Sequence, residues 1–134
     1  MNLLVVEHEA MMRARLRAYL ELILPRCRVL EAGSGAQALG LCASERPELV
    51  LVDITLPDTN GVAFTSRLRA LSPAPAVIVI SYHDVAHYAA RARAAGAYTC
   101  LVKDRLATDL APAIAGALGI KSASKPGSGS SDPA

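Results

Sequence analysis

The chain has 134 residues, of which 52% are hydrophobic and 19% are charged. This length and composition predict one globular domain with a buried core and exclude a disordered chain. The formal net charge of +2 is too small to indicate direct binding to nucleic acid or to an anionic membrane. No apolar run approaches the roughly 20 residues needed to span a bilayer, and the first residues lack the layout of a secretory signal. We therefore expect a cytoplasmic protein.

The cysteines and histidines do not predict a metal centre. Cys27, Cys42 and Cys100 are widely spaced and form no C-x-x-C pair, which argues against a disulfide framework and favours a reducing compartment. We interpret them as small buried hydrophobic residues. His83 and His87 lie one helical turn apart, as in a zinc motif, but no third ligand is evident, and we interpret them as solvated residues.

The first part of the chain predicts a strand, a helix and a second strand. Residues 2–6 form a short apolar run, and the helical pattern that follows ends at about Leu24, before Pro25. Residues 27–32 alternate as a strand does near the edge of a sheet. The buried stripe of the helix consists of apolar residues at helical spacing, namely Met12, Leu16, Leu20 and Ile23.

The next helix is expected from Ser34 to about Glu45, because Ser34 and Gln37 have the spacing of a capping box. The strand after it, residues 49–53, consists of four apolar residues and then Asp53. An apolar run without alternation is typical of a strand that is buried on both faces of a parallel sheet. This strand therefore presents one carboxylate at its carboxyl end.

The second half of the chain repeats the same alternation. Strands are expected at residues 77–80 and 98–102, and helices at about residues 61–71, 84–95 and 108–118. Pro112 is expected in or near the first turn of the last helix, because a proline deeper in a helix breaks it. From Lys121 the composition changes to Ser, Gly, Pro, Lys and Ala. We expect a folded domain over residues 1–120 and a flexible tail or linker over residues 121–134.

Five successive strand–helix units predict an α/β fold with a single doubly wound parallel sheet and helices on both faces. The strands of a parallel sheet point the same way, so their carboxyl ends share one edge, which is where ligands bind in such folds. Polar residues stand at or directly after four of these ends: Glu7-His8, Asp53, Ser81 and Lys103. We interpret this convergence as the functional site.

These residue types suit chemistry on a phosphoryl group. A carboxylate such as Asp53 can attack phosphorus to form an acyl phosphate. The charge that develops is stabilised by cations, usually a lysine and a Mg²⁺ ion held by oxygen ligands. A hydroxyl such as that of Ser81 can donate a hydrogen bond to a phosphoryl oxygen.

The pattern resembles the receiver domain of two-component response regulators over nearly the whole folded part of the chain. The resemblance lies in the acid after the first strand, in Asp53-x-x-x-Pro57-x-x-x-Gly61, in Ser81 after the fourth strand and in Lys103 after the fifth. It implies a flavodoxin-like sheet of five parallel strands in the order 2-1-3-4-5, with strands one and three adjacent at the topological switch point.

The resemblance also implies a function. Asp53 is expected to accept a phosphoryl group from a sensor histidine kinase, within a phosphorelay that switches interactions with partners. Thr55 is expected to offer its backbone carbonyl to a metal ion, Ser81 to act as the switch hydroxyl, and Lys103 to bind the phosphoryl group. We do not expect an enzyme with turnover, although Asp53 can lose the phosphoryl group by autocatalysis.

The end of the first strand departs from the family, which has two adjacent acids where this chain has Glu7 and His8. The second acid is the usual direct ligand of Mg²⁺, whereas imidazole suits zinc, copper, nickel or iron. His8 is therefore expected to weaken Mg²⁺ binding or to admit a softer metal. The remaining oxygen ligands are Glu7, Asp53 and Thr55, with Glu9 as a further candidate. Alternatively, His8 becomes a cation that replaces part of the metal charge, or it is a tolerated change in a site that no longer works.

Two further positions concern the switch and the output. The switch aromatic of the family usually lies three residues before the lysine, which is Cys100 here, and Tyr98 on the same strand face is a candidate substitute. The pair Lys103-Asp104 resembles the subclass whose receivers precede a helix-turn-helix DNA-binding domain. We recognise no such domain in this sequence and expect no direct binding of nucleic acid.

Partners are expected on two surfaces, both by analogy with the family. A kinase or phosphotransfer protein is expected at the exposed part of the first helix, which includes Met11, Arg15 and Ala18. A homodimer is expected through the fourth helix, the fifth strand and the fifth helix. We interpret Arg13 and Arg17 as part of a solvated helix face, and we expect no membrane partner.

Two other functions compete with phosphorylation. A pseudo-receiver would bind partners without being phosphorylated; the missing second acid favours it, while Asp53, Ser81 and Lys103 count against it. A hydrolase could use Asp53-x-Thr55 as a nucleophile motif like that of the haloacid dehalogenases. That family normally has a second acid two residues further on and a cap domain, for which this chain is too short.

Overall fold

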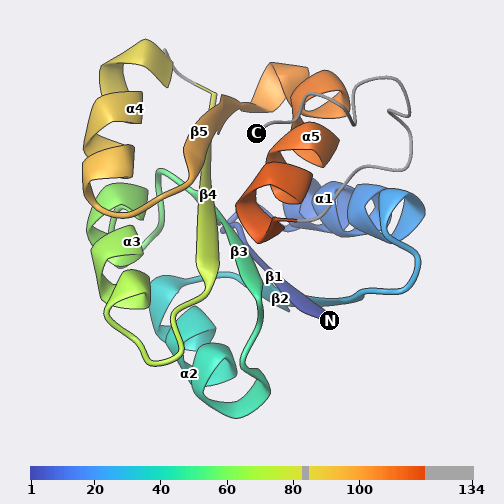
Figure 1. Cartoon of the computed structure of the whole chain (residues 1–134), viewed down its shortest axis with the longest axis horizontal. Coiled ribbons are helices and arrows are strands. Elements are labelled where there is room, and N and C mark those ends of the chain that lie inside the picture. Colours follow the sequence, from blue (N-terminus) through green and yellow to red (C-terminus); the bar gives the residue numbers. More distant parts are fainter. Residues whose placement is uncertain (83–84, 120–134) are drawn as a thin grey trace.

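The central sheet determines where the functional residues lie. In the computed structural model, which describes residues 1–82 and 85–119, five parallel strands are arranged in the order β2-β1-β3-β4-β5 (Figure 1). The strands are β1 (Asn2–Val6), β2 (Arg28–Ala32), β3 (Leu49–Asp53), β4 (Ala76–Ser81) and β5 (Thr99–Val102). Each pair of neighbouring strands is parallel. The predicted fold class and strand order are confirmed.

Helices cover both faces of this sheet. One face carries α1 (Ala10–Ile23) and α5 (Leu106–Leu118), and the other carries α2 (Gly35–Glu45), α3 (Gly61–Arg69) and α4 (Val85–Ala94) (Figure 1). A short 3-10 helix, η1 (Lys103–Arg105), joins β5 to α5. Each face buries its own apolar cluster, so the sheet is shielded from water on both sides, as parallel sheets are.

The central strands are the most deeply buried elements. All residues of β3 are buried, whereas β2 at the edge of the sheet is only partly buried. This difference agrees with the uninterrupted apolar run in the sequence of β3 and the alternation in β2. The register keeps the carboxyl ends level, with Val6 beside Val52, Asp53 beside Ile80, and Ser81 beside Val102.

α2 begins where the capping pattern predicts. Oγ of Ser34 accepts a hydrogen bond from the N–H of Gln37 at 3.2 Å, which satisfies one of the N–H groups left free in the first turn. The side chain of Gln37 accepts from the N–H of Gly33 at 2.8 Å. In a standard capping box this return bond goes to the N–H of the capping residue itself, so here it is displaced by one residue.

α5 differs from the prediction in where it begins. It starts at Leu106, directly after η1, and not near Thr108. Pro112 therefore lies in the second turn, and our expectation of the first turn was wrong. Pro112 has no N–H to offer the carbonyl of Thr108, but both residues are exposed, so water can bond that carbonyl. Leu110 and Ile114 are buried, as their spacing predicts.

Three predictions fall on residues outside the described ranges. They concern the start of the fourth helix at Asp84, the zinc-like spacing that includes His83, and the tail over residues 121–134. Within the described ranges, no helix is long and apolar enough to cross a membrane.

Gly61 allows the chain to turn back directly after the carboxylate of β3. Its N–H donates to the carbonyl of Ile54 at 2.7 Å. A β-carbon at Gly61 would lie 2.8 Å from the carbonyl oxygen of Asp53 and 2.8 Å from Cα of Ile54. These are backbone atoms, which cannot swing aside as a side chain can. The close approach therefore requires glycine.

Asp58 attaches the loop between β3 and α3 to the neighbouring helix α2. Oδ1 accepts from the N–H of Gly35 and Oδ2 from the N–H of Ala36, both at 2.9 Å. These N–H groups lie in the first turn of α2 and have no partner within the helix, and the helix dipole favours an anion there. The hydrogen bonds from Gly35 and Ala36 hold the pKa of Asp58 below its ordinary value.

Gly61→Ala is expected to destabilise the protein by about 1–3 kcal/mol, as other additions of atoms to packed sites do. Gly40 on α2 is the matched control, since, apart from its chain neighbours and the backbone of its own helix, no atom lies within 4 Å of where its β-carbon would be. Gly40→Ala should be neutral or stabilise by up to about 1 kcal/mol, because alanine is the better helix former. Urea unfolding measures both effects, and equal effects of the two substitutions would contradict crowding of the backbone at Gly61.

Asp58→Asn is expected to lower stability at neutral pH, because an amide offers one acceptor oxygen where the carboxylate offers two. The folded pKa of Asp58 is depressed, so its stabilisation is present above the unfolded pKa and is lost as the pH falls through the folded pKa. The difference in thermal midpoint between wild type and variant should therefore shrink as the pH falls from about 7 to about 3. A difference that stays constant over this range would show that the carboxylate charge contributes nothing.

Candidate functional site

The ends of four strands bring polar side chains to one edge of the sheet. Glu7 directly follows β1, Asp53 ends β3, Ser81 ends β4 and Lys103 directly follows β5. All four residues are between 0% and 8% exposed. Charged groups that are this deeply buried require partners. Thr55 lies two residues beyond Asp53 and is exposed.

Lys103 forms buried ion pairs with two carboxylates. Its Nζ lies 2.7 Å from Oε1 of Glu7 and 3.1 Å from Oδ2 of Asp53. The other two carboxylate oxygens are also bonded. Oε2 of Glu7 accepts from the N–H of Glu9 at 3.1 Å, and Oδ1 of Asp53 accepts from the N–H of Thr55 at 3.3 Å. We call Glu7, Asp53 and Lys103 the ion triad.

The ion triad carries excess negative charge, because two carboxylates share one ammonium. Burial raises the pKa of Glu7, and the nearby Asp53 raises it further against the hydrogen bond from Lys103. Burial by itself lowers the pKa of Lys103, but the hydrogen bond and charge of Glu7 and the charge of Asp53 outweigh burial and raise it. With both carboxylates ionised, the triad attracts a further cation.

A hollow of about 330 Å³ opens onto the ion triad. We call it the site hollow. It is formed by the segments that follow β1, β3, β4 and β5 together with the start of α1, and its lining residues are Glu7, His8, Glu9, Met12, Asp53, Ile54, Thr55, Tyr82 and Lys103.

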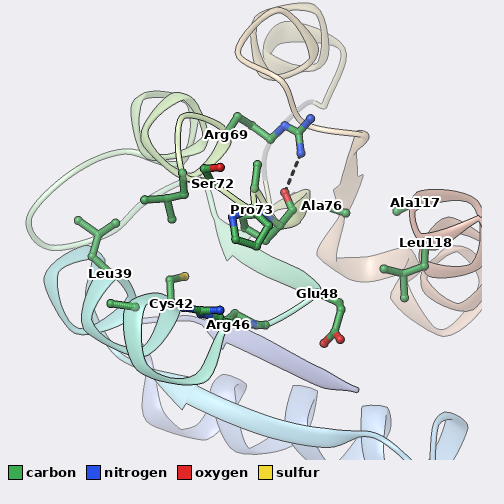
Figure 2. A pocket seen from close by; sticks show the side chains of 15 residues that line it. Leu39, Cys42, Arg46, Glu48, Arg69, Ser72, Pro73, Ala76, Ala117 and Leu118 are labelled. Carbon is green, nitrogen blue, oxygen red and sulfur yellow. Dashed lines mark hydrogen bonds between the residues drawn. The ribbon is translucent and has the colours of Figure 1, made fainter.

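A larger hollow of about 750 Å³ lies at the other edge of the sheet, where β3 and β4 begin (Figure 2). It is lined by the C-terminal ends of α2, α3 and α5 and by the segment from Ser72 to Pro75. Arg69 borders it, and its Nη1 donates to the carbonyl of Pro75 at 2.9 Å. None of the predicted site residues contributes to this hollow, so size alone does not identify the functional site.

Arg13 on α1 holds the segment that contains the unusual Glu7-His8 pair. Its Nη1 donates to the carbonyl of Glu7 at 2.7 Å and to that of His8 at 3.3 Å, and its Nε pairs with Glu31 at 3.3 Å. The side chain of His8 is exposed and lines the site hollow. Our interpretation of Arg13 as solvated was wrong, whereas Arg17 pairs with Glu31 but keeps 43% of its side chain exposed, as a solvated helix face does. Helical periodicity does not reveal acceptors that belong to other elements.

Tyr82 is a site residue that the sequence pattern did not reveal. The centroid of its ring lies 4.4 Å from Nζ of Lys103, which is a cation–π contact. Its Oη lies 3.8 Å from Sδ of Met12 on α1. The one available signal was its position directly after Ser81, and the contact itself depends on how β4, β5 and α1 are placed.

Tyr98 and the cysteines lie away from the ion triad. Tyr98 precedes β5, is exposed, and is not among the residues that line the site hollow. Its hydroxyl lies so close to Gly116 of α5 that a β-carbon there would collide with it. Cys42 and Cys100 are buried, and burial raises the pKa of both thiols. Cys27 is only half-buried.

The donor set of the site fits magnesium, with fewer acids than usual. Hard oxygen donors are the ligands that Mg²⁺ prefers, and the site hollow is lined by the carboxylates of Glu7 and Asp53 and by Thr55, whose carbonyl is the predicted third donor. No group of three or more His, Cys, Asp or Glu side chains suited to a metal ion occurs among residues 1–82 and 85–119. Both oxygens of Glu7 are bonded to protein groups, so a metal must compete with Lys103 or with the N–H of Glu9.

Comparisons with known sequences agree with this geometry. Residues 3–115 match the family model of the response regulator receiver domain. The chain is 39% identical over 128 residues to the positive alginate biosynthesis regulatory protein of Pseudomonas aeruginosa, and the alignment covers 94% of this chain and 48% of that protein.

Solved structures share the fold. A two-component response regulator of the LuxR family from Aurantimonas sp. SI85-9A1 superimposes with a TM-score of 0.77 at 26% identity, covering 88% of this chain and 84% of that one. A response regulator receiver domain protein from Clostridium thermocellum superimposes with a TM-score of 0.79 at 26% identity, covering 88% and 94% of the two chains.

The chain spans about half the length of the curated relatives that it matches, so the likeness describes a domain and not a whole regulator. The family model nevertheless covers most of this chain, and the sheet has the strand order that the resemblance implied. The chain therefore belongs to the response regulator receiver domains of two-component signalling.

Proposed function

We propose that Asp53 accepts a phosphoryl group from the phosphohistidine of a sensor histidine kinase or a phosphotransfer protein, and that this modification switches interactions with partners. The observation that best supports the proposal is the ion pair between buried Asp53 and Lys103, beside Glu7, at the carboxyl edge of the sheet. A fixed ammonium beside a carboxylate nucleophile provides the positive charge that phosphoryl transfer requires.

The transfer is a displacement at phosphorus. A carboxylate oxygen of Asp53 forms a bond to phosphorus while the P–N bond to the donor imidazole breaks, and the bonding electron pair stays with the imidazole. The product is an acyl phosphate on Asp53. Lys103 then pairs with the phosphoryl oxygens, and the hydroxyl of Ser81, at the end of β4, is assigned as the switch group that bonds one of them.

We assign Mg²⁺ binding to Glu7, Asp53 and the carbonyl of Thr55. When bound, Mg²⁺ neutralises charge on the phosphoryl oxygens. His8 offers nitrogen where the family has a second acid, so the affinity for Mg²⁺ is expected to be lower than that of a site with two acids, and a softer divalent metal is the alternative occupant.

A pseudo-receiver is the second candidate, and one observation favours it. The oxygens of Glu7 are already bonded, Oε1 to Nζ of Lys103 at 2.7 Å and Oε2 to the N–H of Glu9 at 3.1 Å, so a metal must displace existing contacts. Such a domain would bind partners without phosphorylation. In neither case do we propose a turnover enzyme; slow hydrolysis of the acyl phosphate on Asp53 only returns the site to its resting state.

We place the kinase contact on the outer surface of α1, where Met11, Arg15 and Ala18 are exposed. The α4–β5–α5 face is the proposed dimer surface, and Tyr98 at the start of β5 stays the candidate switch aromatic for that face. We further propose a cytoplasmic location and an output that acts through a partner protein or an attached module. This chain itself is not proposed to bind nucleic acid.

Incubation with acetyl phosphate and Mg²⁺ is expected to add one phosphoryl group to the wild-type protein. Asp53→Asn keeps the shape of the side chain and removes the nucleophile, so it should add none. Intact-mass analysis measures both. If neither acetyl phosphate nor a phosphorylated kinase domain modifies the wild type, the pseudo-receiver is the better assignment; modification of Asp53→Asn would mean that another residue is the acceptor.

His8→Asp is expected to lower the Mg²⁺ concentration needed for half-maximal labelling by acetyl phosphate at least about tenfold, since loss of even an outer-shell partner changes metal affinity by this much. The side chain of His8 is exposed, so the substitution should leave the fold intact. His8→Ala is the control, because it supplies neither an oxygen ligand nor a positive charge. Equal Mg²⁺ dependence of the wild type and His8→Asp would remove His8 from the metal site.

A further inference from the structure

We propose that Tyr82 carries the phosphorylation state of Asp53 to the surface between α1 and α5. The inference rests on the proposed function and adds a route for its signal. It starts from two contacts of Tyr82, one with Lys103 of the ion triad and one with Met12 of α1.

The ring of Tyr82 completes the surroundings of the Lys103 ammonium. Nζ lies 2.7 Å from Glu7, 3.1 Å from Asp53 and 4.4 Å from the ring centroid. Although Lys103 lines the site hollow, its side chain is only 4% exposed. The π face attracts the ammonium and shields it from water. The position of the ring is therefore coupled to the position of the ammonium.

Tyr82 also borders two hollows. Met12, Tyr82 and Lys103 line both the site hollow and a second hollow of about 280 Å³. We call the second one the α1–α5 hollow, and it is otherwise lined by Arg15, Leu16, Tyr19, Asp104, Leu106 and Ala107. Tyr82 is thus a shared wall, with the phosphoacceptor on one side and the junction of α1 and α5 on the other.

A phosphoryl group on Asp53 changes the interactions of Lys103, and with them the contact that holds the ring of Tyr82 in place. Lys103 then faces additional negative charge on the phosphoryl oxygens, and a cation–π contact weakens when the cation leaves the ring face. Tyr82 is 59% exposed, and its hydroxyl donates to the thioether sulfur of Met12 at 3.8 Å, a weak acceptor. The ring is therefore free to shift when Lys103 does, and a shift reshapes the α1–α5 hollow.

This route differs from the one expected through Tyr98. Tyr98 lies at the amino end of β5, packed on Gly116 of α5 and outside the site hollow. Tyr82 lies at the carboxyl end of β4 and touches Lys103 directly. The geometry therefore directs the signal to the α1–α5 hollow, which shares Arg15 with the surface on which we place the kinase contact.

The test uses beryllofluoride, an inorganic phosphoryl analogue, added to the full chain with Mg²⁺, and its binding is recorded by ¹⁹F NMR. The chain has four tyrosines and no tryptophan, so tyrosine fluorescence can be assigned with single Tyr→Phe variants. We expect a fluorescence change in the wild type and in Tyr98→Phe, and the loss of most of that change in Tyr82→Phe. Loss in Tyr98→Phe, with retention in Tyr82→Phe, would overturn the proposal.

A second measurement separates a signalling role from a structural one. Backbone amide shifts of Tyr19, Leu106 and Ala107 are compared before and after beryllofluoride binding. Tyr82→Phe keeps the π face and should transmit these shifts as the wild type does, whereas Tyr82→Leu should lose most of them and leave the shifts of α4 unchanged. Equal shifts in Phe and Leu variants that bind the analogue would overturn the inference alone. Absence of analogue binding by the wild type, with no phosphorylation by mass, would overturn the proposed function and the inference with it.

Discussion

The ammonium of Lys103 between the carboxylates of Glu7 and Asp53 is the interaction on which the edge of the sheet depends. Three charged side chains are buried here, and burial of unpaired charge is strongly unfavourable. Their pairing connects the segments after β1 and β5 with the end of β3, strands that are not all neighbours in the sheet. Because two anions share one cation, the same arrangement that satisfies the buried charges leaves the site receptive to a further cation.

The segments around the ion triad are held by hydrogen bonds of Arg13 and Asp58, whereas the ring of Tyr82 is held only weakly. Arg13 holds the backbone after β1, and Asp58 attaches the loop after β3 to the first turn of α2. Arg13 and Asp58 both form hydrogen bonds with backbone groups. These bonds position the segments that carry Glu7 and Asp53 and leave the carboxylate oxygens of both residues for other partners. Tyr82 is different, since it is mostly exposed and is held by a cation and a sulfur atom. Arg13 and Asp58 therefore fix the segments around the phosphoacceptor Asp53, whereas Tyr82 is the residue that we propose to move.

Local sequence patterns correctly predicted elements that depend on residues close together in the chain. The apolar run before Asp53 identified a fully buried strand, and Ser34 identified a helix start. The predicted position of Pro112 in the first turn of α5 was wrong, since it lies in the second turn. A proline is tolerated there because the carbonyl of Thr108, which lacks its N–H partner, is on an exposed part of the helix and can bond water. The sequence pattern does not show which carbonyls will be exposed. The prediction was also wrong for Arg13, whose acceptors lie on β2 and in the segment after β1.

The alternation of strands and helices by itself determined that Glu7, Asp53, Ser81 and Lys103 would meet at one edge, because parallel strands all deliver their carboxyl ends to the same side. The residue after Glu7, which is His8, by itself showed that a histidine stands where the family usually has a second acid. Only the tertiary structure decided which oxygens pair with Lys103, that Tyr82 covers its ammonium, and that Tyr98 packs on α5 instead. Lys103 and Glu7 are 96 residues apart, and contacts at such separation depend on how packed elements are placed, which no local periodicity encodes.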